Sequence, residues 1–286
     1  MGIFSFLIAF LGGERALGDE RRTETEREIA KQRYSLLSPT PDEQLRDLAT
    51  DRPDKTESAY TLDAGHFMHE TDIVNYTINQ DGGIREESLF FLAPNLKVGL
   101  TNDTDLQVIY QPYRYKRDRV VATRETHREV GGGDLVVRLK TNVWGNDGGD
   151  TAGAVMPYVV LPVGDRAPGG NEGVEGGLIL PFAASITEDW GLGLMTQLDI
   201  LRGAEHGVYY AQWVNSASVS RSLFGPVSGY AEIFIATSHQ QDPVITADSG
   251  LTWMVGANTQ LDAGINIGVT EEADDLNPFV GVSQRF

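Results

Sequence analysis

The C-terminal stretch, residues 259–286, alternates apolar and polar side chains in two consecutive segments. In residues 260–270 the odd positions are apolar and the even positions are polar or glycine. Because successive side chains of a strand point to opposite sides, this pattern predicts a strand with one apolar and one polar face. Residues 277–286 repeat the pattern with apolar even positions, except at Gln284, and end on Phe286. The two segments predict an amphipathic antiparallel hairpin.

This terminal strand resembles the closing strand of bacterial outer-membrane β-barrels, which ends on Phe after apolar residues at alternate positions. In that group the barrel assembly machinery reads the strand as a signal. Gln284 departs from the pattern, because an apolar or aromatic residue is expected there. The alternative interpretation is a hairpin on the edge of a soluble sandwich. The matching positions are Phe286, Val282, Val280 and Gly281.

Composition limits the remaining classes of protein. A chain of 286 residues is long enough for one large all-β domain or two ordinary domains. After the N-terminus no apolar run reaches the roughly 18 residues of a membrane-spanning helix. The net charge of −18 argues against nucleic acid as a partner, since phosphate binding needs clustered Lys and Arg. Without Cys, the chain has no disulfide framework and no thiolate metal site.

The N-terminal region predicts export followed by a polar arm. Residues 3–11 form an apolar run of signal-peptide length, and small residues near position 18 suit cleavage, so residues 1–18 are expected to be a signal peptide. Residues 19–64 are expected to form a periplasmic arm or plug segment, helical or disordered. Within it, Thr40 before a proline and an acidic first turn predicts a short helix over residues 40–49.

Residues 51–58 carry both signs of charge, which is typical of a polar linker. This run and four later ones are similar to the MetA-pathway of phenol degradation family, over residues 51–286. The resemblance implies an outer-membrane transporter-like barrel, and it brings no substrate-binding residues with it. The runs that carry it are TDRPDKTES, LDAGHF, NLKVGL, GDLVVRLK and ADDLNPFVG.

Amphipathic segments of spanning length recur at regular spacing through residues 65–286. Their number is even, as in bacterial single-chain barrels, and each is long enough for a tilted span of about 9–11 residues. The predicted strands are residues 65–78, 87–100, 105–117, 134–144, 152–163, 174–187, 190–202, 207–222, 228–238, 246–256, 259–270 and 277–286.

The predicted connections alternate between short and long. Turns such as residues 101–104 and 257–258 are tight, whereas the loops at 118–133 and 164–173 are long. Barrels of the outer membrane have short periplasmic turns and longer outside loops, and a soluble sandwich has no reason to alternate in this way. The fold class predicted is therefore all-β: a transmembrane antiparallel up-and-down β-barrel of about 12 strands, with a short N-terminal helical or disordered arm.

Strand parity assigns side chains to the two sides of the wall. A charge facing lipid would cost about 2–4 kcal/mol at the midplane, so the charged parity must face the lumen. Residues expected to face lipid are Leu135, Val137, Leu139, Val143, Leu192, Leu194, Leu198, Ile200, Leu251, Trp253 and Val255. An aromatic girdle is expected at Trp144, Trp190, Phe224, Trp253 and Phe286. Residues expected to face the lumen are Glu70, Asp72, Lys97, Asp105, Asp134, Arg138, Lys140, Glu175, Asp199, Glu232, Asp248, Asp262 and Arg285.

These lumen charges have two interpretations. They form structural ion pairs between neighbouring strands, or they line a polar path whose acidic excess favours cations and uncharged polar solutes. Residues 51–58 are a candidate plug of the lumen, because their mixed charge matches that of the wall. An aromatic solute would need apolar lumen surface, for which the candidates are Tyr113, Tyr115, Met195 and Tyr210.

The sequence contains no constellation that predicts catalysis. His66 and His69 are three apart on a predicted strand, so they point to opposite faces and cannot share a metal. Neither a phosphate-binding glycine loop nor an HExxH motif is present. The nearest hydrolase candidate is His206 with Ser216. We therefore expect no enzyme, no cofactor and no metal site.

The functional expectation is a channel or transporter in the bacterial cell outer membrane, for passive passage of small molecules, with aromatic compounds as one class. The alternatives are a non-conducting structural barrel and an outer-membrane hydrolase. The expected partners are outer-membrane lipid, the barrel assembly machinery and a small-molecule solute, and nucleic acid is not one of them.

Overall fold

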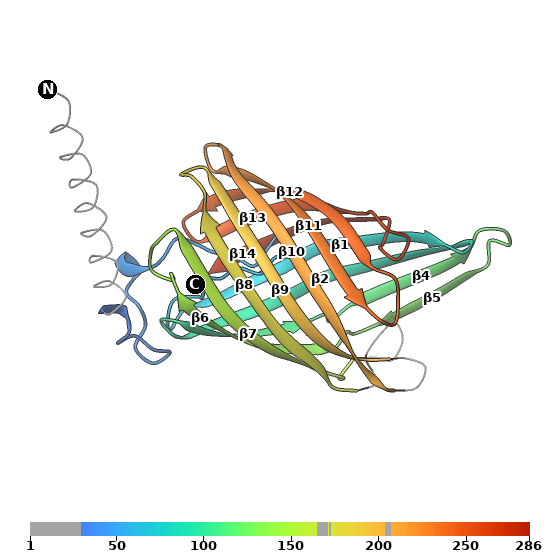
Figure 1. Ribbon diagram of the computed structural model, residues 1–286, viewed down its shortest axis with the longest axis horizontal. Coiled ribbons are helices and arrows are strands. Elements are labelled where there is room, and N and C mark those ends of the chain that lie inside the picture. Colours follow the sequence, from blue (N-terminus) through green and yellow to red (C-terminus); the bar gives the residue numbers. More distant parts are fainter. Residues whose placement is uncertain (1–29, 165–170, 172, 204–206) are drawn as a thin grey trace, which may run out of the picture.

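The computed structural model describes residues 30–164, 171, 173–203 and 207–286. The predicted signal peptide, residues 1–18, and the first part of the predicted arm lie outside the described residues, as does His206. The described chain contains one short 3-10 helix and strands β1 to β14 (Figure 1). Their bounds are η1 Asp42–Gln44, β1 Phe67–Asp81, β2 Ile84–Thr101, β3 Thr104–Tyr110, β4 Arg114–Val120, β5 Thr126–Gly131, β6 Leu135–Trp144, β7 Thr151–Leu161, β8 Glu175–Ser185, β9 Trp190–Arg202, β10 Tyr209–Phe224, β11 Val227–Ser238, β12 Val244–Gly256, β13 Thr259–Gly268 and β14 Leu276–Arg285.

All strands except β4 and β5 close into an antiparallel barrel of 12 strands. The ring runs β1, β2, β3, then β6 through β14, and β1 pairs with both β2 and β14. The ring is closed in part by Phe67, the first residue of β1, and Phe286, which follows β14. Their backbones exchange two hydrogen bonds, of 3.2 and 2.7 Å. The prediction of an antiparallel transmembrane barrel of about 12 strands is confirmed.

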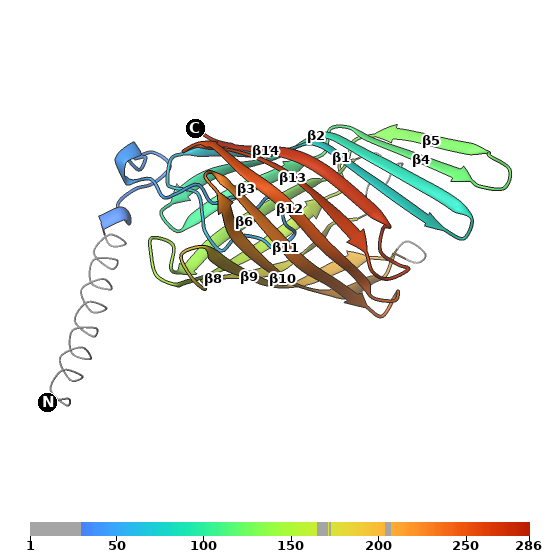
Figure 2. The same ribbon diagram turned by 90° about the horizontal axis from the view of Figure 1, so that it is seen from above.

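The third predicted strand, residues 105–117, is wrong as a single element. The chain leaves the barrel wall at Pro112, which has no N–H to donate to a ladder. Before it, β3 pairs with β2 and β6. After it, β4 pairs with the distal part of β2 and then with β5. The predicted loop at residues 118–133 is therefore largely a hairpin, which extends beyond the ring (Figure 2).

The barrel wall follows the two-residue period of the sequence. In β12, for example, Thr246 and Asp248 are buried, while Leu251, Trp253 and Val255 are exposed. Every residue that parity assigns to lipid is exposed or half-buried, and its neighbours on the other parity include the buried polar groups of the interior. Apolar surface thus covers the outside of the barrel, and polar side chains fill its inside.

The two ends of the barrel differ. Short connections such as residues 102–103 and 257–258 lie at the end where the C-terminus and the N-terminal arm also lie (Figure 1). The longer loops and the β4–β5 hairpin lie at the other end. The aromatic residues expected in a girdle are all exposed, at Trp144, Trp190, Phe224, Trp253 and Phe286, near the short-turn end.

The helix predicted over residues 40–49 is wrong beyond one short turn. Only Asp42–Gln44 is helical, its N-cap is Pro41, and no side chain caps it. The chain after it is extended, because Arg46 binds elsewhere: its backbone N–H donates to Asp63, and its guanidinium reaches Asn102 and Asp147. Tertiary contacts override the local helix signal. No helix among the described residues is long and apolar enough to cross a membrane.

Candidate functional site: the barrel lumen

Residues 50–62, here called the inner segment, enter the lumen from the short-turn mouth and return to it. The Ser58 N–H donates to Asp51 Oδ1 at 3.0 Å, so the two ends of the innermost loop lie side by side. The tip is Lys55 and Thr56, which reach Thr246 on β12 and Ser216 on β10. Ser216 lies near the middle of β10, and Thr246 is the third residue of β12 from the long-loop end, so the loop extends at least to the middle of the wall.

Asp51 is the centre of the most buried cluster. Its carboxylate accepts hydrogen bonds from Lys97 at 2.5 Å and from Lys140, two wall lysines that are almost fully buried. Its own N–H donates to Glu70 at 3.0 Å, and Lys97 also pairs with Glu70. Burial raises the pKa of Asp51, but the charges of Lys140 and Lys97 outweigh burial and hold that pKa far below its ordinary value. Asp51 is therefore ionised and compensates two buried cations.

The basic residues of the inner segment pair with acids of the wall. Arg52 pairs with Asp72 at 2.6 Å and with Asp262 at 2.7 Å, and the Lys55 ammonium lies 3.2 Å from Asp248. Acids of β1, β12 and β13 thus neutralise the positive charges of these two side chains.

The remaining contacts of the tip complete the match. The Thr56 hydroxyl donates to Glu232 at 2.5 Å and is hydrogen-bonded to Ser216 at 2.6 Å. Glu57 forms an ion pair with Arg138 on β6. Acids of the inner segment therefore meet wall bases on β2 and β6, whereas its bases meet wall acids on β1, β12 and β13. Four of the charged side chains in residues 51–58, Asp51, Arg52, Lys55 and Glu57, thus each meet a wall charge of the opposite sign.

Asp54 is the exception to this pairing. It lies beside Glu232 and Ser218 of the wall and close to Glu57 of its own segment. Burial and the negative charge of Glu232 raise the pKa of Asp54 to about 7. This carboxyl therefore changes charge near neutral pH.

Two wall glycines provide the space in which the inner segment lies. A Cβ added to Gly281 would collide with the Arg52 guanidinium. A Cβ added to Gly99 would lie 2.6 Å from the carbonyl carbon of Asp63 and 2.8 Å from the Leu62 oxygen, closer than real Cβ contacts. Glycine is therefore required at Gly99, where backbone approaches, whereas at Gly281 the Arg52 side chain would have to move.

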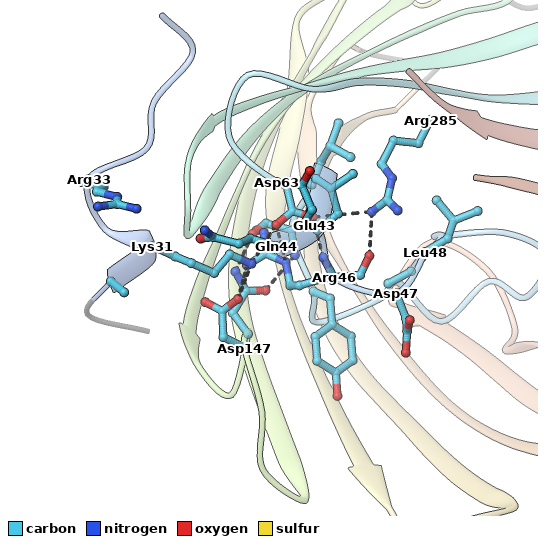
Figure 3. Close-up of a pocket in the computed structure, with 17 residues that line it drawn as sticks. Lys31, Arg33, Glu43, Gln44, Arg46, Asp47, Leu48, Asp63, Asp147 and Arg285 are labelled. Carbon is cyan, nitrogen blue, oxygen red and sulfur yellow. Dashed lines mark hydrogen bonds and ion pairs between the residues drawn. The ribbon is translucent and has the colours of Figure 1, made fainter. Parts of the chain in front are cut away.

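A second charged group, here called the mouth cluster, holds the arm against the short-turn end (Figure 3). Lys31 bridges Asp63 at 2.9 Å and Asp147 at 2.6 Å, and Arg46 bridges the same two acids at 3.4 and 3.1 Å. Arg285 of β14 adds a contact to Asp63 at 3.4 Å. These side chains converge on a cavity of about 850 Å³ at the mouth. These ion pairs join the arm, the residue that follows the inner segment, a turn and the last strand.

The interior also has an apolar part. Met195, predicted as apolar lumen surface, is buried in a cluster on β7 to β11 whose members are Met156, Ile179, Met195, Val214 and Ala236. Tyr158 and Phe234 pack against it. Of the tyrosines predicted with Met195, Tyr210 lies edge-on to His239, whereas Tyr113 is exposed in the connection between β3 and β4, and Tyr115 is half-buried on β4.

The structure places the other expected lumen residues in several settings. Asp105 and Asp199 are buried; Asp105 accepts the Leu62 N–H, and Asp199 accepts the Tyr158 hydroxyl. Asp134 and Glu175 are half-buried at the long-loop end and accept backbone N–H groups of Gly164 and Arg202. The 13 residues are thus not one site: most contact the inner segment or its neighbours, one lies in the mouth cluster, and these two support loops.

The proposed assembly residues lie on both sides of β14. Val280 and Phe286 are exposed on the outer surface and Val282 is half-buried, whereas Gly281 faces Arg52 inside. His69 stacks against Phe286 with ring centroids 5.9 Å apart. The exposed face is available as a recognition surface, which remains a prediction.

The described residues show no arrangement that favours catalysis by the hydrolase candidate. Ser216 is buried in the lumen and hydrogen-bonded to Thr56. Groups of three or more His, Cys, Asp or Glu that suit a metal ion are absent from the described part of the chain. His66 contacts the backbone oxygens of Thr40 and Phe286.

Sequence reasoning missed the neutral polar groups of the site. Gln107 donates to Asp51 at 3.1 Å, and Asn102 and Asn146 bind the returning part of the inner segment. Gln107 has the inward parity of Asp105, so the same alternation identifies it. Asn102 and Asn146 lie in turns, where parity gives no signal.

The architecture defines the class: a closed transmembrane-type β-barrel whose lumen contains its own N-terminal segment. A model of the family described as "Putative MetA-pathway of phenol degradation" matches residues 50–286. The chain belongs to this family, and the match begins at the inner segment.

The comparison with solved structures finds outer-membrane barrels of very different sequence. An outer membrane channel from Pseudomonas putida F1 is 11% identical, with a TM-score of 0.58 over 83% of this chain and 100% of that one. The NanC porin is 9% identical, with a TM-score of 0.48 over 75% and 98%. The toluene transporter TbuX from Ralstonia pickettii is 7% identical, with a TM-score of 0.40 over 77% and 89%. The first supports the fold, and the other two scores are too low to support an argument. No curated protein sequence matches the chain.

Proposed function

We propose that this protein is a passive channel of the bacterial outer membrane for small molecules, and that the inner segment controls the passage. The observation that carries the proposal is the polar filling of the lumen: a charged loop enters from one mouth and binds the wall through hydrogen bonds and ion pairs. A purely structural barrel needs no inner side chains that match an inserted loop in charge. The apolar outside, the closed ring and the terminal aromatic residue support insertion in the outer membrane.

The wall suits two classes of solute. Around the inner segment the wall contributes seven acids and three bases, namely Glu70, Asp72, Asp105, Asp199, Glu232, Asp248, Asp262, Lys97, Arg138 and Lys140. Because acidic linings raise the local concentration of cations, we propose cations and uncharged polar solutes as the main class. Aromatic compounds are the second class, supported by the apolar cluster around Met195 and by the family's link to phenol degradation.

Replacing residues 52–57 by two glycines is expected to raise single-channel conductance in planar bilayers. The replacement is feasible because residues 51 and 58 are already adjacent. It also removes Arg52 and Lys55 from their acids, so the cation preference of the open form should increase and should weaken at high salt. Exchanging Asp248 and Asp262 for asparagine in this variant should reduce the preference.

Two outcomes would contradict the proposal. If neither the full protein nor the loop variant conducts, the barrel is structural. If the open variant prefers anions, the assignment of an acidic lumen is wrong.

The seating of the inner segment is expected to weaken as pH rises from about 4 to about 7. The pKa of Asp54 is 3.8 when free and about 7 when docked, so docking binds a proton. The contribution of Asp54 protonation to docking is fully present below the free pKa and is lost as pH rises through the docked pKa. Between these two pKa values the docking equilibrium constant falls by up to about tenfold per pH unit. Single-channel records should show more openings at pH 7.5 than at pH 5, the two recording pH values being about half a unit above and two units below the docked pKa. Asp54→Asn should remove most of that difference, and an unchanged pH profile would show that other groups control docking.

A further inference from the structure

The distal parts of β1 and β2 and the β4–β5 hairpin form a small four-stranded sheet that extends beyond the ring (Figure 2). Its two faces can be assigned from the register of the strands. At the bulge in β1, Asp72 pairs with Gly281, which faces the lumen, but Val74 pairs with Val280, which is exposed outside. Side-chain parity along β1 therefore reverses at this bulge. Val74 also pairs with Phe91, so β2 changes parity at the same level.

After this reversal, the odd positions of β2 from Phe91 to Arg85 face outward. The register then places their partners on the same outer face. Nearest the ring is an apolar row of Leu89, Tyr115 and Val130. Next come the rows Glu87, Arg117 and Arg128, and then Arg85, Arg119 and Thr126.

This outer face, here called the arginine face, has four arginines and one acid. Glu87 is buried between Arg85, at 3.0 Å, and Arg117. Arg119 and Arg128 are exposed, and each stands directly opposite another arginine: Arg119 opposite Arg85 and Arg128 opposite Arg117. Like charges that face each other across strands are destabilising unless an anion lies between them. The chain as a whole carries a net charge of −18, so this local excess of positive charge is exceptional.

The inner face of the same sheet is balanced. Lys116 bridges Glu86 at 3.1 Å and Asp118 at 3.6 Å, and His127 contacts Glu129 at 3.1 Å. The excess of positive charge is thus confined to the face of the sheet that continues the lipid-facing surface of the barrel. An ordinary solvated hairpin has no reason to separate its charges in this way.

We propose that the arginine face binds the phosphate groups of phosphorylated lipids in the outer leaflet of the outer membrane. The proposal rests on the outer-membrane location inferred above, which puts the end opposite the termini at the cell surface. The apolar row of Leu89, Tyr115 and Val130 then lies at the edge of the hydrocarbon, and the arginines follow at headgroup level. Guanidinium groups form bidentate hydrogen bonds with phosphate, so a sheet face with several arginines suits a phosphate ligand.

Native mass spectrometry of the detergent-solubilised full-length protein with bis-phosphorylated lipid A tests the proposal. The wild type should retain the lipid, and the double variant Arg119→Gln, Arg128→Gln should retain it about tenfold less, because each lost arginine removes charge-assisted bonds. Arg85 and Arg117 are kept so that Glu87 stays paired. The matched control is Arg33→Gln with Arg124→Gln, which removes the same charge from the arm and the hairpin tip and should bind like wild type.

Three results would overturn the proposal. They are equal retention by the double variant, equal retention of lipid A lacking both phosphates, and full displacement by millimolar inorganic phosphate, which would indicate a site for free anions. Conductance in phosphatidylcholine bilayers tests the channel function separately from lipid binding. The double variant should conduct like wild type there, and a barrel that binds lipid A without conducting would refute only the channel.

Discussion

Exchange of Asp51 for asparagine is expected to convert a mostly closed channel into a mostly open one. In the closed form Asp51 compensates Lys97 and Lys140, both buried in the wall. Removing one partner of a buried ion pair costs about 3–5 kcal/mol, because the remaining charge stays uncompensated. When the inner segment leaves, water can reach both lysines, so the cost falls on the docked state and docking should weaken by at least about a hundredfold.

Open probability in planar bilayers measures this effect. Asp42→Asn is the matched control, since Asp42 is an exposed acid of the same arm and its exchange should leave gating unchanged. Exchange of both Asp51 and Asp42 should behave like exchange of Asp51 alone. An Asp51→Asn channel with the open probability of the wild type would show that the lysines are satisfied by Glu70 and Asp105.

Adding a single methyl group at Gly99 is expected to expel the inner segment without removing any of its contacts. The new Cβ of Gly99→Ala would overlap the backbone of Asp63 and Leu62, which cannot rotate away as a side chain can. Overpacking of this kind costs about 1–3 kcal/mol or more, so docking should weaken about tenfold to a hundredfold. The strand itself tolerates alanine, because Gly99 has no left-handed backbone angle.

Gly256→Ala is the control, since a Cβ at Gly256 meets nothing within 4 Å. Both variants should fold and insert equally, as judged by heat-dependent migration on gels, and only Gly99→Ala should raise the open probability. If Gly99→Ala gates like the control, the returning part of the inner segment is free to shift and does not set the closed state.

The alternating pattern was enough to predict the barrel, its strand number and the inward parity of residues such as Lys140 and Asp248. Alternation carries this information because each wall residue has only two choices of side. The mixed charge of residues 51–58 also indicated a plug, although pairing partners such as Asp51 with Lys140 lie 89 positions apart and no local rule connects them.

Features that depend on tertiary contact were not predictable in this way. The hairpin of β4 and β5 looked like a loop, because its strands are charged on both faces and pack against no core. The helix predicted after Thr40 does not extend beyond one turn, because the tertiary contacts of Arg46 favour an extended chain. No local pattern marks Gly99 or Gly281 as a point of close approach to the inner segment, and Gly281 was predicted only as part of the assembly signal.

The uneven distribution of wall charges has a consequence once the inner segment has left. Lys97, Arg138 and Lys140 on β2 and β6 then stand beside the acids Glu70 and Asp105, while Glu232, Asp248 and Asp262 stand together on β11, β12 and β13. The electrostatic potential of the empty passage is therefore more negative beside β11, β12 and β13 than beside β2 and β6, and the resulting field runs transverse to the direction of travel. A zwitterion or strongly dipolar molecule that crosses this zone is therefore turned, with its positive end toward β11, β12 and β13, so the passage sorts solutes by dipole orientation as well as by charge.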